Sequence, residues 1–342
     1  MSCRRPSFLL FAILLLAASA AAADTLLVAN KTDHTVDLVD PRTGESRATL
    51  PTGEFPHEIA VDPDGRLAAI SNYGNRGAPG NSITVIDLAA REVVRTIDLG
   101  DNTRPHGMVW TEKRLIVTTE GSKKLLVVDP ADGRVVHGIA TDQEISHMVA
   151  VTPDGSRAFV GNIGSGSVTV IDLAAGRKIK DIETGAGAEG LTVTPDGEEV
   201  WVGNRGADTL TVIDAKSLEI LEQVPCKGVP IRVVSTGDGK RILVSCARTG
   251  EVAAFDREQR KELVRRKLDL STVPDAASRL FGDRFGESPV PVGLVISPDD
   301  RKAWVAATQS DVVVVVDVVT LDVLDLIRTG REPDGMAYTS DD

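Results

Sequence analysis

Apolar and polar residues along this chain alternate, or apolar residues run together, over stretches of five to eight positions bounded by Gly, Pro, Asp and Asn. Three such stretches follow one another as RAFVGN from Arg157, SVTVIDL from Ser167 and RKIKDIETG from Arg177. Alternation with a period of two is typical of a half-buried strand, and a short apolar run between turn residues indicates a strand buried on both faces. The pattern predicts a protein built from short strands.

The strand pattern itself repeats. VTPDG at Val151 recurs at Val193, and weaker copies begin at Val61, Ser235 and Ile296. A period of about 40 to 45 residues that holds four strands and no helix is typical of a β-propeller blade. Pro and Gly in these copies suit the second and last positions of a tight turn, which supports the alignment of the units.

Aligning the turns places a second strand in each of seven units: Leu26–Asn30, Leu67–Asn72, Arg114–Thr119, Arg157–Asn162, Glu199–Asn204, Arg241–Cys246 and Lys302–Ala307. We therefore predict an all-β fold, a seven-bladed β-propeller of four-stranded antiparallel blades over residues 24–342. The repeats begin at a second strand and end after the first-strand pattern DGMAYTS. The C-terminal segment should therefore supply the innermost strand of the first blade, which closes the ring and leaves no open sheet edge.

Residues 1–23 have the pattern of a secretory signal peptide. Arg4 and Arg5 precede the apolar run FLLFAILLL, and three alanines precede Asp24. The run is too short to span a membrane, and no later segment is apolar for 18 residues. We expect a soluble protein without a membrane span, located in the periplasm or secreted.

The net charge restricts the classes of partner, and the two cysteines after residue 23 suggest a disulfide. Without Arg4 and Arg5 the chain carries 36 basic and 50 acidic residues, a net charge near −14, which argues against nucleic acid or anionic lipid as a partner. We expect a monomer that meets a small molecule or a protein at its loop-rich face. Cys226 and Cys246 are predicted to lie on the same face within reach of a disulfide, as an oxidising compartment favours; two free thiols are the alternative.

The period also aligns the start of each innermost strand. The second residue of that strand is in turn His57, His106, His147, Glu189, Ile231, Val292 and Asp334. Three of the five histidines of the chain therefore occupy one position in three consecutive blades. Innermost strands begin around the central channel, so these side chains should converge at one mouth of it.

Imidazoles and carboxylates that converge suit Zn, Cu, Fe or Ni. The candidate ligands are His57, His106 and His147, followed by Glu189 and Asp334. Some seven-bladed propeller enzymes hold copper with histidines at the channel mouth, which this arrangement resembles in outline. The alternative is structural: duplication of one ancestral His gives the same pattern, and adjacent blades could hold the rings too far apart to share an ion.

Other residues are expected on the same face. His34 follows a second strand. An insertion over residues 269–291, read as lid-like, should bring Arg279, Phe281, Arg284 and Phe285 to the channel mouth. Arginines and aromatic rings there would suit an anionic or aromatic ligand, and a surface elaboration without function is the alternative.

The segments AFVGNIGSGSVTVIDLAAGRKI and VWVGNRGADTLTVIDAKSLEI resemble the YVTN family of β-propeller repeats, which includes YncE-like propellers and relatives of cytochrome d1 and lactonase-type propellers. The resemblance covers residues 24–342 and implies the propeller fold, but the family spans many functions. Three functions stay open: a binding protein for a metal, small ligand or partner at the His-bearing face; a metal-dependent lyase, lactonase-type hydrolase or copper redox enzyme; and an interaction scaffold without metal.

Overall fold

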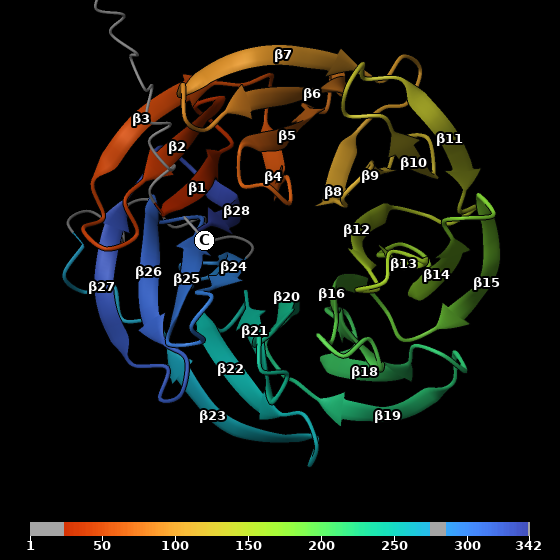
Figure 1. Cartoon of the computed structure of the whole chain (residues 1–342). Coiled ribbons are helices and arrows are strands. Elements are labelled where there is room, and N and C mark those ends of the chain that lie inside the picture. The colour runs from red at the N-terminus through yellow and green to blue at the C-terminus, as the bar shows by residue number, and fades with distance from the viewer. Residues whose placement is uncertain (1–23, 274–284, 341–342) are drawn as a thin grey trace, which may run out of the picture.

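The computed structural model describes residues 24–273 and 285–340, and these form seven four-stranded antiparallel sheets arranged as the blades of a ring around a central channel (Figure 1). The innermost strands are β4 (Pro56–Val61), β8 (Pro105–Trp110), β12 (Ser146–Val151), β16 (Ala188–Val193), β20 (Pro230–Ser235), β24 (Pro291–Ile296) and β28 (Pro333–Thr339). The second strands are β1 (Thr25–Asn30), β5 (Leu67–Gly74), β9 (Leu115–Thr119), β13 (Arg157–Asn162), β17 (Glu199–Asn204), β21 (Arg241–Cys246) and β25 (Lys302–Ala307).

The third and outer strands complete each blade. The third strands are β2 (Thr35–Val39), β6 (Pro79–Asp87), β10 (Lys124–Val128), β14 (Ser167–Asp172), β18 (Thr209–Asp214), β22 (Glu251–Asp256) and β26 (Val312–Asp317). The outer strands are β3 (Ser46–Pro51), β7 (Glu92–Asp98), β11 (Val135–Ala140), β15 (Arg177–Glu183), β19 (Ile220–Pro225), β23 (Lys261–Lys267) and β27 (Val323–Arg328). The predicted fold class, blade number and position of the second strands are confirmed.

The ring closes through β28, which pairs with β1 in the sheet order β28-β1-β2-β3. Leu26 lies opposite Tyr338 in this pair, and Leu27 lies opposite Ala337. The pairing confirms the predicted closure by the C-terminal strand. Closure joins the two ends of a linear series of blades, so neither terminal blade presents an unpaired strand towards the channel.

The core lies between neighbouring blades, because each sheet is buried on both faces in its second and third strands. In β14, for example, Val168, Val170 and Ile171 are fully buried. Aliphatic side chains supply most of these contacts, and burying one Val or Ile contributes about 1.5–3 kcal/mol. The outer strands lie at the rim of the ring and are mostly exposed: β15 and β19 each have a single buried residue.

The predicted turns also form as expected. Gly155 has a φ of 68°, a left-handed conformation that favours glycine, and its N–H donates to the carbonyl of Thr152 at 2.8 Å. At the other end of the blade, the Asn at the end of the second strand donates to hydroxyls of the third strand. Asn162 Nδ2, for instance, lies 2.9 Å from Thr169 Oγ1. This asparagine therefore ties the second strand to the third at this end of the blade.

Two predicted segments lie outside the described residues: the signal peptide over residues 1–23, and the part of the insertion that carries Arg279, Phe281 and Arg284. Within the described ranges, no helix has the length and hydrophobicity needed to cross a bilayer.

Candidate metal and ligand site at the channel mouth

A β-bulge interrupts the pairing of the innermost and second strands in all seven blades. In the second blade, the register shifts between Pro56 and Ile59, and the equivalent shift occurs in each of the others. A bulge bends the strand and changes the direction of its side chains. The aligned residues sit in these bulges, so the fold aims one side chain per blade at the channel mouth.

All seven aligned residues line one pocket of about 810 Å³. The structure therefore brings together every predicted ring residue: His57, His106, His147, Glu189, Ile231, Val292 and Asp334. Four consecutive blades contribute His or Glu, and the next two contribute Ile and Val. The pocket therefore has one polar and one apolar side.

The three histidines lie against one another. The ring centroids of His57 and His106 are 5.0 Å apart, and those of His106 and His147 are only 3.6 Å apart with the planes 32° from parallel. Side chains from neighbouring blades therefore come into contact at the bulges. The rings of His106 and His147 are close enough to bind one ion.

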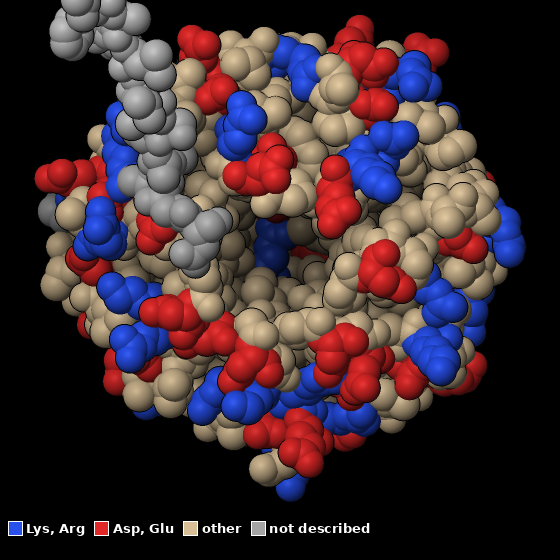
Figure 2. Space-filling model, viewed as in Figure 1, with Lys and Arg blue, Asp and Glu red and all other residues tan. Residues whose placement is uncertain are grey.

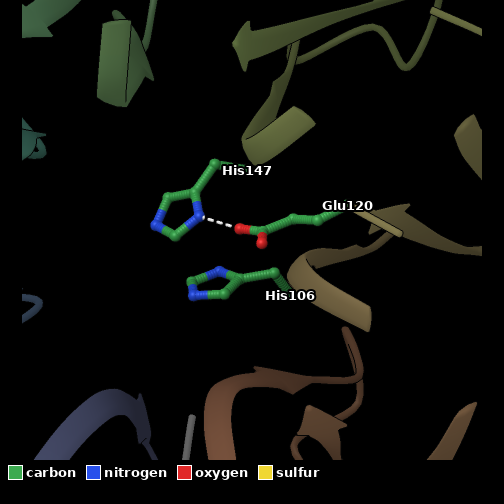
Figure 3. Close-up of side chains that lie close together, drawn as sticks. All are labelled: His106, Glu120 and His147. Atoms are coloured by element: carbon green, nitrogen blue, oxygen red, sulfur yellow. Dashed lines mark hydrogen bonds and ion pairs between the residues drawn. The ribbon is translucent and has the colours of Figure 1, made fainter. Parts of the chain in front are cut away.

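A carboxylate that the sequence pattern did not single out completes this cluster. Glu120 lies directly after β9, and one of its oxygens accepts a hydrogen bond from Nδ1 of His147 (Figure 3). Potential ligand atoms of His106, Glu120 and His147 all lie within 4.8 Å of one another. Two histidines and one carboxylate form the donor set of many catalytic zinc sites and of non-heme Fe(II) sites.

Glu120 belongs to a second aligned position, the residue after the second-strand residue that pairs with the first residue of the innermost strand. In order, this position holds Lys31, Tyr73, Glu120, Ile163, Arg205, Ala247 and Thr308. Two of these residues form ion pairs with aligned residues of the innermost strands: Lys31 pairs with Asp334 at 3.3 Å, and Arg205 pairs with Glu189 at 2.7 Å. The same sequence repeat also aligns the residues at the ends of the second strands, which lie next to the starts of the innermost strands. Comparing those residues between blades would have identified Glu120.

Neighbouring groups orient the two carboxylates around His147. The hydroxyl of Tyr73 donates to the second oxygen of Glu120 at 2.5 Å. Glu189 Oε1 lies 3.4 Å from Nε2 of His147. Burial, followed by the charge of Glu120, raises the pKa of Tyr73 to about 12, so this phenol stays a donor at neutral pH. Such partners fix the direction of a ligating side chain.

The three imidazoles differ in protonation. Burial alone would lower the pKa of His147, but hydrogen bonds to Glu120 and Glu189 outweigh burial and raise the pKa to about 9. Burial and then the neighbouring rings of His147 and His57 hold the pKa of His106 well below its ordinary value. At neutral pH a cationic ring therefore stacks on a neutral one.

His106 carries the clearest unmet bonding capacity. Within the described residues its Nδ1 is buried and has no hydrogen-bond partner. A buried polar atom without a partner costs about 1–3 kcal/mol. The position next to Glu120 and His147 is therefore one that a metal ion or a ligand atom would stabilise.

His57 has a defined tautomer. Its Nδ1 lies 2.9 Å from the carbonyl of Phe55, which can only accept, so the proton is on Nδ1 and Nε2 keeps a lone pair. Burial lowers the pKa of His57 to about 4, although the nearby Asp334 opposes this effect. His57 is thus a neutral acceptor that lines the same pocket.

Below the rings an ion pair crosses the channel. Glu58 and Arg232 occupy the position after the aligned residue in their blades, and both are buried. Figure 2 shows the corresponding hollow at the centre of the ring, with a basic side chain deep within it. Glycine occupies this position in four other blades. A Cβ on Gly107 would lie 2.6 Å from the carbonyl oxygen of His147, so glycine lets adjacent innermost strands approach each other.

The remaining predicted site residues differ in their positions relative to the pocket. Phe285, within the insertion, lines the pocket, whereas the other lid residues lie outside the described part. His34 contacts the next loop instead: its Nδ1 accepts the N–H of Phe55 at 3.0 Å, and it is not among the residues that line the pocket. The ligand role expected of His34 therefore has no support from its position.

Cys226 and Cys246 are buried, lie side by side as predicted, and are unbonded thiols with 4.0 Å between the sulfurs. Arg265 Nη1 lies 3.3 Å from Cys246 Sγ. A hydrogen bond with Cys226, followed by the guanidinium of Arg265, lowers the pKa of Cys246. The disulfide between them stays a prediction.

The fold and the pocket define a seven-bladed propeller with a polar site at one channel mouth. A model of the YNCE-like beta-propeller family matches residues 113–284, half of the chain. The protein belongs to this family. The resemblance to YVTN-type propellers is therefore confirmed.

The solved structures agree on the fold. Hydrazine synthase from Kuenenia stuttgartiensis matches with a TM-score of 0.70 at 19% identity, over 92% of this chain and 100% of that chain. A functionally unknown protein from Desulfotomaculum acetoxidans matches with a TM-score of 0.76 at 15% identity, over 93% and 99%. The dihydro-heme d1 dehydrogenase NirN in complex with DHE matches with a TM-score of 0.64 at 16% identity, over 92% and 74%. None of the curated proteins compared matches in sequence. Identities this low establish the fold alone.

Proposed function

We propose that the protein is an exported propeller that binds one divalent transition metal ion at its channel mouth, with His106, His147 and Glu120 as ligands. Two observations carry the proposal: Nδ1 of His106 is buried without a partner among the described residues, and one ligand atom each of His106, Glu120 and His147 lie within 4.8 Å of one another. Nitrogen and carboxylate donors suit Zn, Cu, Ni and Fe(II).

The residues around His147 suit a site in which binding of a metal ion displaces the proton of the imidazole. His147 is protonated at neutral pH because it lies between Glu120 and Glu189, and a metal ion would replace that proton as the source of positive charge. With three protein ligands, the ion would keep a coordination position for a small molecule, as catalytic zinc sites do. Glu189 and Asp334, which the sequence also suggested as ligands, already pair with Arg205 and Lys31. They would therefore balance charge around the ion.

The test is the metal content of protein purified without an affinity-tag metal and then reconstituted separately with Zn²⁺, Cu²⁺, Ni²⁺ and Fe²⁺. We expect about one equivalent by elemental analysis, and loss of that equivalent in the His106→Ala/His147→Ala double variant. His137→Ala is the matched control, because His137 is exposed on β11 at the rim of the ring. Failure to take up any of the four ions, or equal uptake by the double variant, would contradict the proposal.

A further inference from the structure

The pocket continues from the histidines across the channel mouth to a surface of different chemistry. We define the apolar wall as Ile231, Phe285, Val290 and Val292, all of which line the pocket. Val290 and Ile231 belong to one small hydrophobic cluster, against which Phe285 and Val292 pack. The wall comes from the two blades whose aligned position holds Ile or Val where earlier blades hold His or Glu. It therefore faces the polar side within one cavity.

The size of the cavity points to a small molecule. A volume of about 810 Å³ falls within the usual range of roughly 300–1,000 Å³ for sites of small organic ligands. Such sites combine an apolar lining with a few convergent polar groups, as this one does.

Four charged groups on the pocket wall form two ion pairs. Lys31 binds Asp334, and Glu58 binds Arg232 beneath the rings. Glu332 also lines the pocket and accepts a hydrogen bond from the hydroxyl of Thr32, so it is a further charged group, and no ion pair joins it to another described residue. By contrast, Nε2 of His57 keeps a lone pair, because Nδ1 is held by the carbonyl of Phe55. The polar side thus offers an acceptor beside the proposed open coordination position.

From this arrangement we propose that the pocket binds a small amphipathic organic molecule with an oxygen donor, a carboxylate or hydroxyl, at one end and an apolar body at the other. The donor completes the coordination of the metal ion, and a hydroxyl in that place donates to Nε2 of His57. The apolar body lies on the wall formed by Ile231, Val290, Val292 and Phe285. This inference rests on the proposed metal site for its head group and on the wall for its body.

Isothermal titration with 2-naphthoate, a planar apolar carboxylate, tests both ends. The Zn²⁺-loaded protein is expected to bind it at least about tenfold more tightly than the metal-free protein, because coordination adds to apolar contact. Ile231→Ser should weaken binding about tenfold, because the wall loses apolar area at its centre. Val292→Ser is a second wall variant, in case the first does not fold. Leu221→Ser, at an exposed position of β19, is the matched control and should bind as the unaltered protein does.

Zn²⁺ uptake is measured in every sample, so that failure of the metal site is distinguished from failure of the wall. If Zn²⁺ binds but 2-naphthoate does not bind below about 1 mM, or binds equally to the wall variants, the inference is overturned while the proposed function stands. If Zn²⁺ does not bind, the proposed function fails; weaker binding of 2-naphthoate by the wall variants would then still support the apolar half of the inference.

Discussion

Glu58 and Arg232, 174 residues apart in the chain, form a buried ion pair inside the central channel. Arg232 also directs Nη1 at the sulfur of Met148, so one guanidinium connects three blades beneath the histidines. The pair forms only when the ring is complete, because its partners come from blades on different sides of the channel.

Removing one partner of this pair should destabilise the protein strongly. Arg232→Met is expected to lower the free energy of unfolding by about 3–5 kcal/mol, because it leaves the carboxylate of Glu58 buried without a counter-charge. Urea unfolding followed by circular dichroism measures the change. The double variant Glu58→Gln/Arg232→Met should recover part of the loss. Lys240→Met, which breaks an exposed pair with Asp238, is the control and should stay within about 0.5 kcal/mol. A loss below about 1 kcal/mol for Arg232→Met would show that the pair is not needed.

Tyr73 should affect the metal through Glu120. Tyr73→Phe removes the hydroxyl that holds the second carboxylate oxygen and is expected to lower metal affinity about tenfold to a hundredfold. Competition with a chromophoric chelator measures the affinity. The melting temperature of the metal-free protein should change little, since the ring stays in place. An unchanged metal affinity would show that the hydrogen bond from Tyr73 to Glu120 does not contribute to metal binding.

Glu120→Gln should weaken metal binding by a larger factor than Tyr73→Phe does, because the amide replaces a charged ligand. The same chelator competition measures the effect. The variant should also lower the pKa of His147, which loses a carboxylate neighbour, and NMR titration of the ring protons would show this. Metal affinity equal to that of the unaltered protein would mean that the ion, if bound, lies elsewhere in the pocket.

Acid should destabilise the metal-free protein through His57. The pKa of this ring falls from 6.5 in the unfolded chain to about 4 in the fold because it is buried. Its contribution is therefore fully present above pH 6.5 and is lost as the pH falls towards 4, because the unfolded chain takes up the proton first. The loss amounts to about 3 kcal/mol at the low end. In a His57→Asn variant, the free energy of unfolding should depend less on pH between pH 6.5 and 4.5. An unchanged pH dependence would contradict the lowered pKa of His57.

His147 acts in the opposite direction. Its pKa is raised to about 9, so the stability that it contributes is present below pH 6.5 and is lost as the pH rises through 9. The metal-free protein should therefore lose stability on the alkaline side as well. In a His147→Gln variant, unfolding measured from pH 6.5 to 9.5 should show a smaller dependence on pH. Equal slopes in the two proteins would show that the ring is not protonated in the fold.

The thiol pair gives a redox prediction. Protein from an oxidising compartment should contain the Cys226–Cys246 disulfide and show no free thiol on titration after unfolding. Closing a loop of 20 residues should stabilise the fold by about 3 kcal/mol, so adding a reductant should shift the urea midpoint downward. Cys246→Ala should not respond to the reductant. Two free thiols in the oxidised preparation would show that the pair stays reduced.

Gly107 should be intolerant of a side chain. Gly107→Ala places a methyl group 2.6 Å from the backbone oxygen of His147, where neither strand can move freely. We expect a loss of about 1–3 kcal/mol, as for other overpacked positions, together with weaker metal uptake because His147 is displaced. Gly77→Ala is the matched control, since its nearest neighbour is 3.5 Å away. Equal stability of the two variants would contradict the close approach of β8 and β12.

The periodic sequence was sufficient to predict the blades and the ring of aligned residues. A strand that recurs every 40 to 45 residues must occupy the same place in each blade, so His57, His106 and His147 could be assigned to one position without coordinates. Glu120 was not predicted, because the candidate ligands were taken from the start of the innermost strand, whereas Glu120 follows the end of a second strand.

Other features could not be predicted from any period. The 3.6 Å approach of His106 and His147 depends on the bulge that aims each ring, and the contact of Glu58 with Arg232 depends on closure across the channel. A repeat determines which residues are equivalent within their blades, because equivalence is a property of local spacing. Which of them touch, and which atom stays unpartnered as Nδ1 of His106 does, is decided by the tertiary structure, since those distances exist only after all seven blades have packed into one ring.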